Sequence, residues 1–438
     1  MCSNGQGKVN PGGFCGRASA ERCSDGFERR IRQLFNNWVA KAQTRKRPNI
    51  GLRQGIAVIG VGSVGRREMS KLSDADLLVL SARGVPRSLI PDLKDHILKE
   101  SAKKGYVKAF ISFPGAETVT QCKRLAMADD FFNAEIKTSR LLAGSKSLFK
   151  SFVAATGQHL FRHTSQKVQC NALLDLWAWG EDYRFVDERK DAPNVKRGRG
   201  AMRNILAVAL VGKTMYGIRG GSCEVLLRNL MKRKAFHDCE SAGDVDDLLA
   251  AFDFYLFLRH EIHEIRFPWG KPHITPRTPK YKLDELDREV RATIAKRHPN
   301  VWSSHRHLLR EYRATRDRVL GAFGRLAERF VEDIVSRIPC KWREAFEQAR
   351  QSAGLCARQC EPLANHANLL VRFALAWHAT NRKALSAVYQ RSQGLPGRWN
   401  VDYALSRNAS TPPAVAKNLV ALKGAENKPI SNRARELV

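Results

Sequence analysis

Residues 62–80 read GSVGRREMSKLSDADLLVL and combine a Gly-Ser pair, a short helical segment, two aspartates separated by one alanine, and an apolar run. The preceding residues Gly55-Ile-Ala-Val-Ile-Gly60 predict a short buried strand, and Ala75–Ser81 predicts a second one. Downstream, the spacing of apolar residues predicts a helix at Leu89–Lys103 and a third strand at Tyr106–Phe113. Strands and a helix in this order predict an α/β or α+β domain.

Two parts of this stretch carry groups that could bind a ligand: the Gly-Ser pair and the two aspartates. Gly62 lets the backbone approach a ligand closely, and the Ser63 hydroxyl and the first N–H groups of the following helix are donors for a phosphate. Alternate residues of a strand point to one side, so Asp74 and Asp76 present their carboxylates together beside this turn. Two adjacent negative charges favour a bound cation, and oxygen ligands beside the phosphates of an NTP favour Mg²⁺ or Mn²⁺. Two such ions about 4 Å apart activate an attacking hydroxyl and stabilise a leaving pyrophosphate.

Neither motif is specific alone, because Asp-x-Asp is typical of strand-edge turns and Gly-Ser turns are common. The ordered combination of strand, Gly-Ser, helix, Ser-Asp-x-Asp and apolar strand is specific, and it predicts a nucleotide- and metal-binding site. Residues 62–80 closely resemble the nucleotidyltransferase signature of the bacterial PII-protein uridylyltransferase family, within the DNA polymerase β superfamily.

The resemblance continues over about residues 50–330. Pro193–Ile205 (PNVKRGRGAMRNI) resembles the family segment P-(N/D)-(I/V)-K-x-x-x-G-G-L-R-D-I, and Arg259 with His263 resembles the R…LH pair of a later helix. The other matches lie between these segments: Cys122, Asp129, Ser139–Gly144 and Leu148-Phe149. The resemblance implies an α+β protein in which a polymerase-β-like mixed sheet precedes a large all-helical region.

The resemblance also implies roles for individual residues. Asp74 and Asp76 are the expected catalytic, metal-binding carboxylates. The residues expected near the nucleotide or the acceptor are Gly62, Ser63, Arg66, Lys196 and Arg203. Lys196 lies in a glycine-broken basic loop suited to anions, although a solvated loop explains it equally well. Arg203 is explained equally well as a structural residue of a helix.

Three departures from the family pattern bear on activity. The strand Lys108–Phe113 carries no acid where the enzymes have a third carboxylate that helps activate the nucleophile. Glu117 is the nearest downstream acid, and Ser112 would supply only a neutral ligand. Asn204 stands where the family has Asp. The resemblance does not extend to a phosphohydrolase domain or ligand-sensing domains, so nucleotide removal and glutamine sensing are not expected.

Length and composition predict roughly two to four domains. We expect a disordered head at 1–24, a nucleotidyltransferase domain at 25–150, a helical substrate- or nucleotide-closing domain at 151–337, and a helical C-terminal region at 338–438. In the last region, Ala374-Leu375 and Ala384-Leu385 recur thirty positions later as Ala404-Leu405 and Ala414-Val415. This recurrence indicates either two units of a helix-pair solenoid or a chance match between alanine-rich helices.

The cysteines and apolar segments bear on cofactors and location. The ten cysteines include no CxxC pair, so Cys356, Cys360 and His366 indicate buried thiols or, alternatively, a zinc site. The head lacks the apolar core of a signal peptide, and apolar stretches such as Ile205–Val211 are too short to span a bilayer. We therefore expect a cytoplasmic protein without a membrane partner, or one delivered by a secretion system that needs no cleaved signal.

The sequence leaves several functions open. The first is an enzyme, uridylyl- or adenylyltransferase-like, that moves an NMP from an NTP to a hydroxyl; the resemblance favours a protein acceptor, PII-like or other, over RNA. The alternatives are a catalytically degenerate nucleotide-binding module for regulatory or partner contacts, a nucleotidyltransferase acting on RNA, and a toxin or effector that modifies host protein or tRNA. The formal charge of +32 attracts polyanions, or reflects a solvated basic surface, and no feature predicts DNA specificity.

Overall fold

The computed structural model describes residues 15–45, 51–102, 111–113, 116–128, 136, 138–160, 166–181, 192–218, 220–266, 283–395, 398–422 and 428–438. Within them, four strands form a mixed sheet in the order β3-β2-β1-β4. They are β1 (Ile56–Gly60), β2 (Ala75–Ser81), β3 (Ile111–Ser112) and β4 (Arg140–Gly144). β1 pairs antiparallel with β2 and β4, and β2 pairs parallel with β3.

The structure confirms the α+β class and the first two predicted strands. It also confirms the helix predicted at Leu89–Lys103, which is α4 (Leu89–Ala102). Only the end of the predicted third strand is described, as β3, and residues 106–110 lie outside the described part of the chain.

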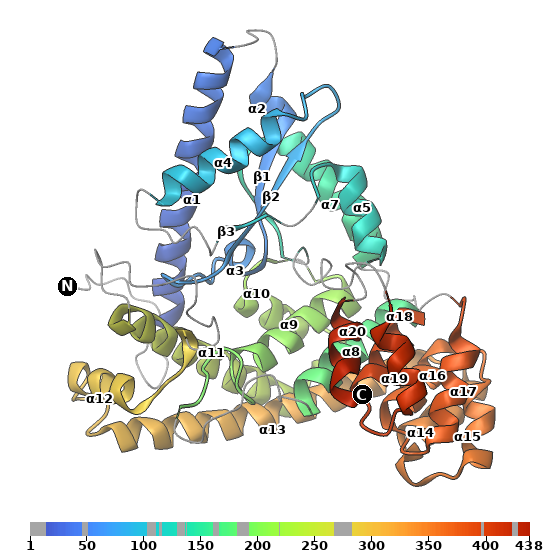
Figure 1. The fold of residues 1–438 in the computed structure, drawn as a ribbon. Helices are drawn as coiled ribbons and strands as arrows, with labels where there is room; N and C mark the ends of the chain where they lie inside the picture. Colours follow the sequence, from blue (N-terminus) through green and yellow to red (C-terminus); the bar gives the residue numbers. More distant parts are fainter. Residues whose placement is uncertain are drawn as a thin grey trace.

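Helices cover both faces of the sheet because its central strands are apolar at nearly every position. The covering helices are α1 (Gly16–Arg45) and α4 on one face and α5 (Val119–Ala128) and α7 (Lys146–Leu160) on the other (Figure 1). Leu77 and Val79 of β2 pack in one cluster with Ile31 of α1. Leu78 of β2 points the other way and packs with Phe152 of α7. Two short helices, α2 (Leu52–Gly55) and α3 (Gly62–Arg66), flank β1.

The first helix extends into the segment that we expected to be a disordered head. α1 starts at Gly16, so residues 16–24 are helical and the prediction of a disordered head is wrong for that part; residues 1–14 lie outside the described residues. The Arg17 N–H donates to Asp253 Oδ1 at 2.7 Å, and the Arg17 guanidinium lies 2.5 Å from the Glu224 carboxylate. Tertiary contacts therefore fix a helix start whose composition alone favours a tail.

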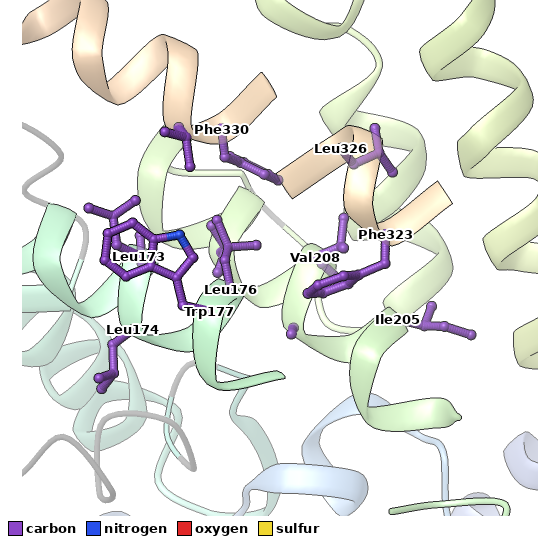
Figure 2. Close-up of a cluster of buried hydrophobic side chains, with 14 of the residues drawn as sticks. Leu173, Leu174, Leu176, Trp177, Ile205, Val208, Phe323, Leu326 and Phe330 are labelled. Carbon is purple, nitrogen blue, oxygen red and sulfur yellow. The ribbon is translucent and has the colours of Figure 1, made fainter. Parts of the chain in front are cut away.

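A second, larger core holds the helical region together. Its helices are α8 (Gln166–Glu181), α9 (Met202–Tyr216), α10 (Cys223–Leu230), α11 (Cys239–Arg266), α12 (Arg288–Arg297) and α13 (His305–Arg337). Figure 2 shows apolar side chains of α8, α9 and α13 meeting in this core, among them Trp177, Val208 and Phe323. Among the described helices, none combines the length and apolar composition that crossing a bilayer requires.

The last hundred residues form a stack of helix pairs, drawn in orange and red in Figure 1. Its helices are α14 (Cys340–Arg350), α15 (Ala357–Ala364), α16 (Leu369–His378), α17 (Arg382–Ser392), α18 (Arg398–Arg407), α19 (Pro413–Val420) and α20 (Lys428–Ala434). α14 packs on α16, α16 on α18 and α18 on α20, while α15 packs on α17. Three 3₁₀ helices complete the described elements: η2 (Lys234–Phe236), η4 (Ser352–Gly354) and η6 (Arg435–Leu437).

The thirty-residue recurrence falls at equivalent places in this stack. Ala374-Leu375 lies in α16 and Ala404-Leu405 in α18, and all four side chains are buried. The Asn408 side chain donates to the carbonyls of Ala376 at 2.9 Å and Ala379 at 2.8 Å, so it links the end of α18 to the end of α16. The recurring segments therefore occupy corresponding positions in successive helix pairs, and the repeat itself stays a prediction.

The stack is joined to the helical region through α8, which packs against α16 and α18. The ring of Trp177 in α8 stacks on Phe373 of α16, with centroids 5.5 Å apart. The edge of the His378 ring meets Trp177 at 4.7 Å. These contacts bury Trp177 between the two regions.

Candidate active site

The Gly-Ser turn and the two aspartates lie against each other. β1 leads into Gly62, whose φ is +57°, and α3 begins there. The Val61 N–H donates to the Asp76 carbonyl at 3.0 Å, and the Ser63 hydroxyl donates to the Asp74 carbonyl at 3.1 Å. A Cβ added at Gly62 would lie 3.3 Å from Asp76 Oδ2. The structure thus brings together the four residues on which the sequence prediction depends.

Both aspartates lie on the accessible side of their strand. Asp74 immediately precedes β2 and Asp76 is its second residue. Both are partly exposed, whereas the alternating residues Ala75 and Leu77 are buried. Because alternate residues share a side of a strand, the two carboxylates are directed to one accessible place beside the Gly62 turn.

Ser112 lies in the strand where the family resemblance leads us to expect a third carboxylate. It lies opposite Asp76 in the parallel β2–β3 pair, is exposed, and its hydroxyl donates to Asp76 Oδ1 at 2.5 Å. The Ser112 hydroxyl therefore orients Asp76 and adds no negative charge.

Glu117 is not a substitute for the missing acid. Its carbonyl accepts a hydrogen bond from the N–H of Ser81, at the far end of β2, and its carboxylate lies 2.6 Å from Lys94 Nζ. The five residue steps along the strand from Asp76 to Ser81 correspond to about 16 Å. Glu117, the nearest downstream acid, therefore lies too far from Asp76 to act as the third carboxylate. Among the described side chains, no group of three or more His, Cys, Asp or Glu could hold a metal, which also excludes the zinc site considered at Cys356, Cys360 and His366.

The basic loop places Lys196 near the aspartates. Asn194 Oδ1 accepts from the N–H groups of Lys196 at 3.1 Å and Arg197 at 2.7 Å, and the Arg203 N–H donates to the Lys196 carbonyl at 3.2 Å. Desolvation, with the positive charges of Arg259 and Arg203, lowers the pKa of Lys196 to about 7, while Asp284 and Asp74 oppose this shift. Lys196 is therefore close enough to Asp74 for their charges to interact.

The Asn204 departure has a structural explanation. Its buried Oδ1 accepts a hydrogen bond from the Gly200 N–H at 3.0 Å. The Tyr255 hydroxyl donates to the Gly200 carbonyl at 2.8 Å. A neutral amide supplies the acceptor that this loop needs and avoids burying a charge.

Arg66 is engaged in an ion pair. Its Nε lies 2.6 Å from Glu68 Oε2, and Glu68 Oε1 accepts from the Cys223 N–H at 2.6 Å. Burial raises the pKa of Glu68, and the Arg66 charge opposes that rise. Arg66 thus compensates a buried carboxylate that connects α3 with α10, and the predicted role of Arg66 in nucleotide binding stays a prediction.

A buried polar cluster next to Asp74 was not predicted as part of the site. Arg259 Nε lies 2.7 Å from Asp284 Oδ1, and Arg259 Nη1 donates to the Ser73 hydroxyl at 2.9 Å. His263 Nε2 lies 3.0 Å from the same Asp284 oxygen, and the Leu72 N–H donates to His263 Nδ1 at 3.4 Å. Arg259 and His263 were noted only through the family resemblance, and nothing in the sequence pattern indicated Asp284.

The cluster has a defined charge state. Burial lowers the pKa of His263 to about 4, more than Asp284 raises it, so the ring is neutral near pH 7. Since Nδ1 accepts from Leu72, the ring proton is on Nε2 and is donated to Asp284. Burial alone would raise the pKa of Asp284, but the Arg259 guanidinium and the His263 hydrogen bond hold it well below its usual range.

No protein-family model matches this sequence. Three curated relatives, each named bifunctional uridylyltransferase/uridylyl-removing enzyme, match part of it. The Nitrosococcus oceani protein is 25% identical over 217 residues, 48% of this chain and 22% of the relative. The Ruegeria pomeroyi protein is 29% identical over 37% of this chain and 17% of its own length. The Bordetella avium protein is 30% identical over 36% of this chain and 17% of its own length. The chain matches about a fifth of the length of these relatives.

Proposed function

We propose that this chain is a metal-dependent nucleotidyltransferase that moves an NMP from an NTP to a hydroxyl of a protein acceptor. One observation carries the proposal: Asp74 and Asp76 are partly exposed at alternating positions beside the Gly62 turn, and the Asp76 carboxylate lies against that turn. The partial similarity to uridylyltransferases supports this chemistry and makes UTP the first nucleotide to test.

The donor set fits a divalent cation. Two partly exposed carboxylates, which belong to no larger cluster of metal-binding side chains among the described residues, leave coordination positions for phosphate oxygens and water, as Mg²⁺ or Mn²⁺ requires. Asp74 and Asp76 would hold the ion, which would neutralise the phosphates and polarise the phosphorus that is attacked. We also propose that the surrounding sheet is a polymerase-β-like nucleotidyltransferase domain.

The other residues of the site have supporting roles in this proposal. The missing side chain at Gly62 leaves space for the triphosphate. Ser63 holds the backbone of Asp74, and Ser112 holds the carboxylate of Asp76. The positive charge of Arg203, together with Lys196 where it is protonated, favours a polyphosphate on this side of the sheet. The acceptor oxygen bonds to the α-phosphorus as the bond to pyrophosphate breaks.

A degenerate nucleotide-binding module is the second candidate. The observation that favours it is the neutral Ser112 beside Asp76, because a third carboxylate there would help to remove the proton of the acceptor hydroxyl. In that case the site would bind the metal and the nucleotide but transfer nothing.

Transfer from α-³²P-labelled NTPs to lysate proteins, with Mg²⁺ or Mn²⁺, tests the enzyme. We expect Asp74→Asn and Asp76→Asn to reduce labelling at least a hundredfold, because each removes a proposed metal ligand. Asp95→Asn is the matched control, since it makes the same change at an exposed carboxylate paired with Lys99 on α4. Labelling by Asp74→Asn/Asp76→Asn equal to wild type would refute the enzyme. Metal and nucleotide binding without labelling would support the module.

A further inference from the structure

The connection between α3 and β2, residues 67–73, leads directly to Asp74 and has little regular structure of its own. Helix α1, which precedes this connection in the sequence, and helix α11, which follows it, both hold it in place. The Met69 N–H donates to the Ser24 hydroxyl of α1 at 3.1 Å, and the Arg67 guanidinium contacts both Asp25 oxygens at 2.6 and 2.7 Å. The position of Asp74 therefore depends on partners outside the sheet.

The last two residues of this connection are anchored by α11. Arg259 donates to the Ser73 hydroxyl, and His263 accepts from the N–H of Leu72. Ser73 also accepts from the Ser70 N–H at 2.8 Å, so the turn before Asp74 is closed on itself and attached to α11. Movement of Arg259 or His263 would move the backbone next to Asp74.

Asp284 fixes both α11 side chains through a single oxygen, and all three groups are buried. In this water-excluded place, the hydrogen bonds of an ionised carboxylate are strong and directional. The Asp284 carbonyl also accepts from the Val195 N–H at 3.0 Å, next to Lys196. One residue thus connects the turn before Asp74 with the basic loop.

We propose that Arg259, His263 and Asp284 are positioning residues of the nucleotidyltransferase site, which set the distance between the Asp74 carboxylate and the Lys196 loop. None of the three touches the reacting atoms. The inference rests on the proposed function and adds that the helical region is required for the geometry of the metal site.

Mn²⁺ binding to the full-length protein, followed by electron paramagnetic resonance, tests the inference without requiring turnover. We expect Asp284→Asn to weaken Mn²⁺ binding by at most about tenfold, the lower end of the loss seen for a direct outer partner of a ligand, because Asp284 reaches Asp74 only through Arg259, His263 and the turn. Asp287→Asn is the matched control: Asp287 pairs with Arg266 of α11 at 2.6 Å, and its substitution leaves the contacts of Leu72 and Ser73 intact. The control should bind Mn²⁺ like the wild type.

Two further variants separate the outcomes. Ser73→Ala removes the Arg259 contact to the turn together with the hydrogen bond from Ser70, and it tests the same link if Asp284→Asn does not fold. We expect it to weaken Mn²⁺ binding severalfold. Weakened binding in Asp74→Asn with wild-type binding in both Asp284→Asn and Ser73→Ala would overturn the positioning role and leave the proposed function intact. Wild-type binding in Asp74→Asn would overturn the proposed metal site itself.

Discussion

Gly62→Ala should lower both the free energy of unfolding and the rate of nucleotidyl transfer. The φ of +57° places residue 62 in the left-handed region, where an alanine loses about 1–2 kcal/mol relative to glycine. The new Cβ would also lie 3.3 Å from Asp76 Oδ2, so the carboxylate would have to shift by a few tenths of an ångström. Since errors of about 1 Å in a reacting geometry reduce rates about a hundredfold, we expect about a tenfold loss of transfer.

Gly217→Ala separates the two effects. Gly217 ends α9 with a φ of +59°, and its added Cβ would meet no atom within 4 Å. In urea denaturation both variants should lose about 1–2 kcal/mol of unfolding free energy. In nucleotidyl transfer with Mg²⁺, only Gly62→Ala should fall about tenfold. Equal transfer rates for the two variants would refute the argument that Gly62 makes room beside Asp76.

Two further predictions follow from Ser112 and His263. Ser112→Asp places a carboxylate beside Asp76 and should raise Mg²⁺-dependent transfer severalfold. Glu117→Gln, which changes an acid beside the far end of β2, should leave the transfer rate unchanged. An unchanged rate in Ser112→Asp would contradict the expected site of the third carboxylate. The pKa of His263 is about 4 when folded and about 6.5 when unfolded, so its contribution to stability is complete above pH 6.5 and is lost as the pH falls towards 4. The free energy of unfolding should drop by about 2 kcal/mol more between pH 7 and pH 5 in wild type than in His263→Asn, and parallel pH profiles would contradict the neutral buried ring.

Local patterns in the sequence predicted the first two strands and the turn between them, but not β4, which lies in a segment we expected to be helical. The apolar run of β2 and the Gly-Ser pair are contiguous, and their physical consequences act over a few residues. The start of α1 was not predictable in this way, because Arg17 is held by Asp253 and Glu224 from helices distant in the sequence.

The supporting part of the site could not be read from the sequence for the same reason. Asp284 has no local pattern, and its importance depends on burial beside Arg259 and His263, which folding brings together. Glu117 was the nearest acid along the chain, but the register of β2 places it at the wrong end of the strand. Distance along the sequence therefore did not indicate which side chains lie near the aspartates in the folded chain.

The ring stack between Trp177 and Phe373 has a practical consequence for protein production. A truncation after α13 would leave the indole of Trp177, and the apolar surface of α8 around it, facing water. Such a fragment should self-associate or be degraded, even though every proposed ligand of the metal and nucleotide lies upstream of the cut. Protein produced for activity measurements should therefore retain the C-terminal stack.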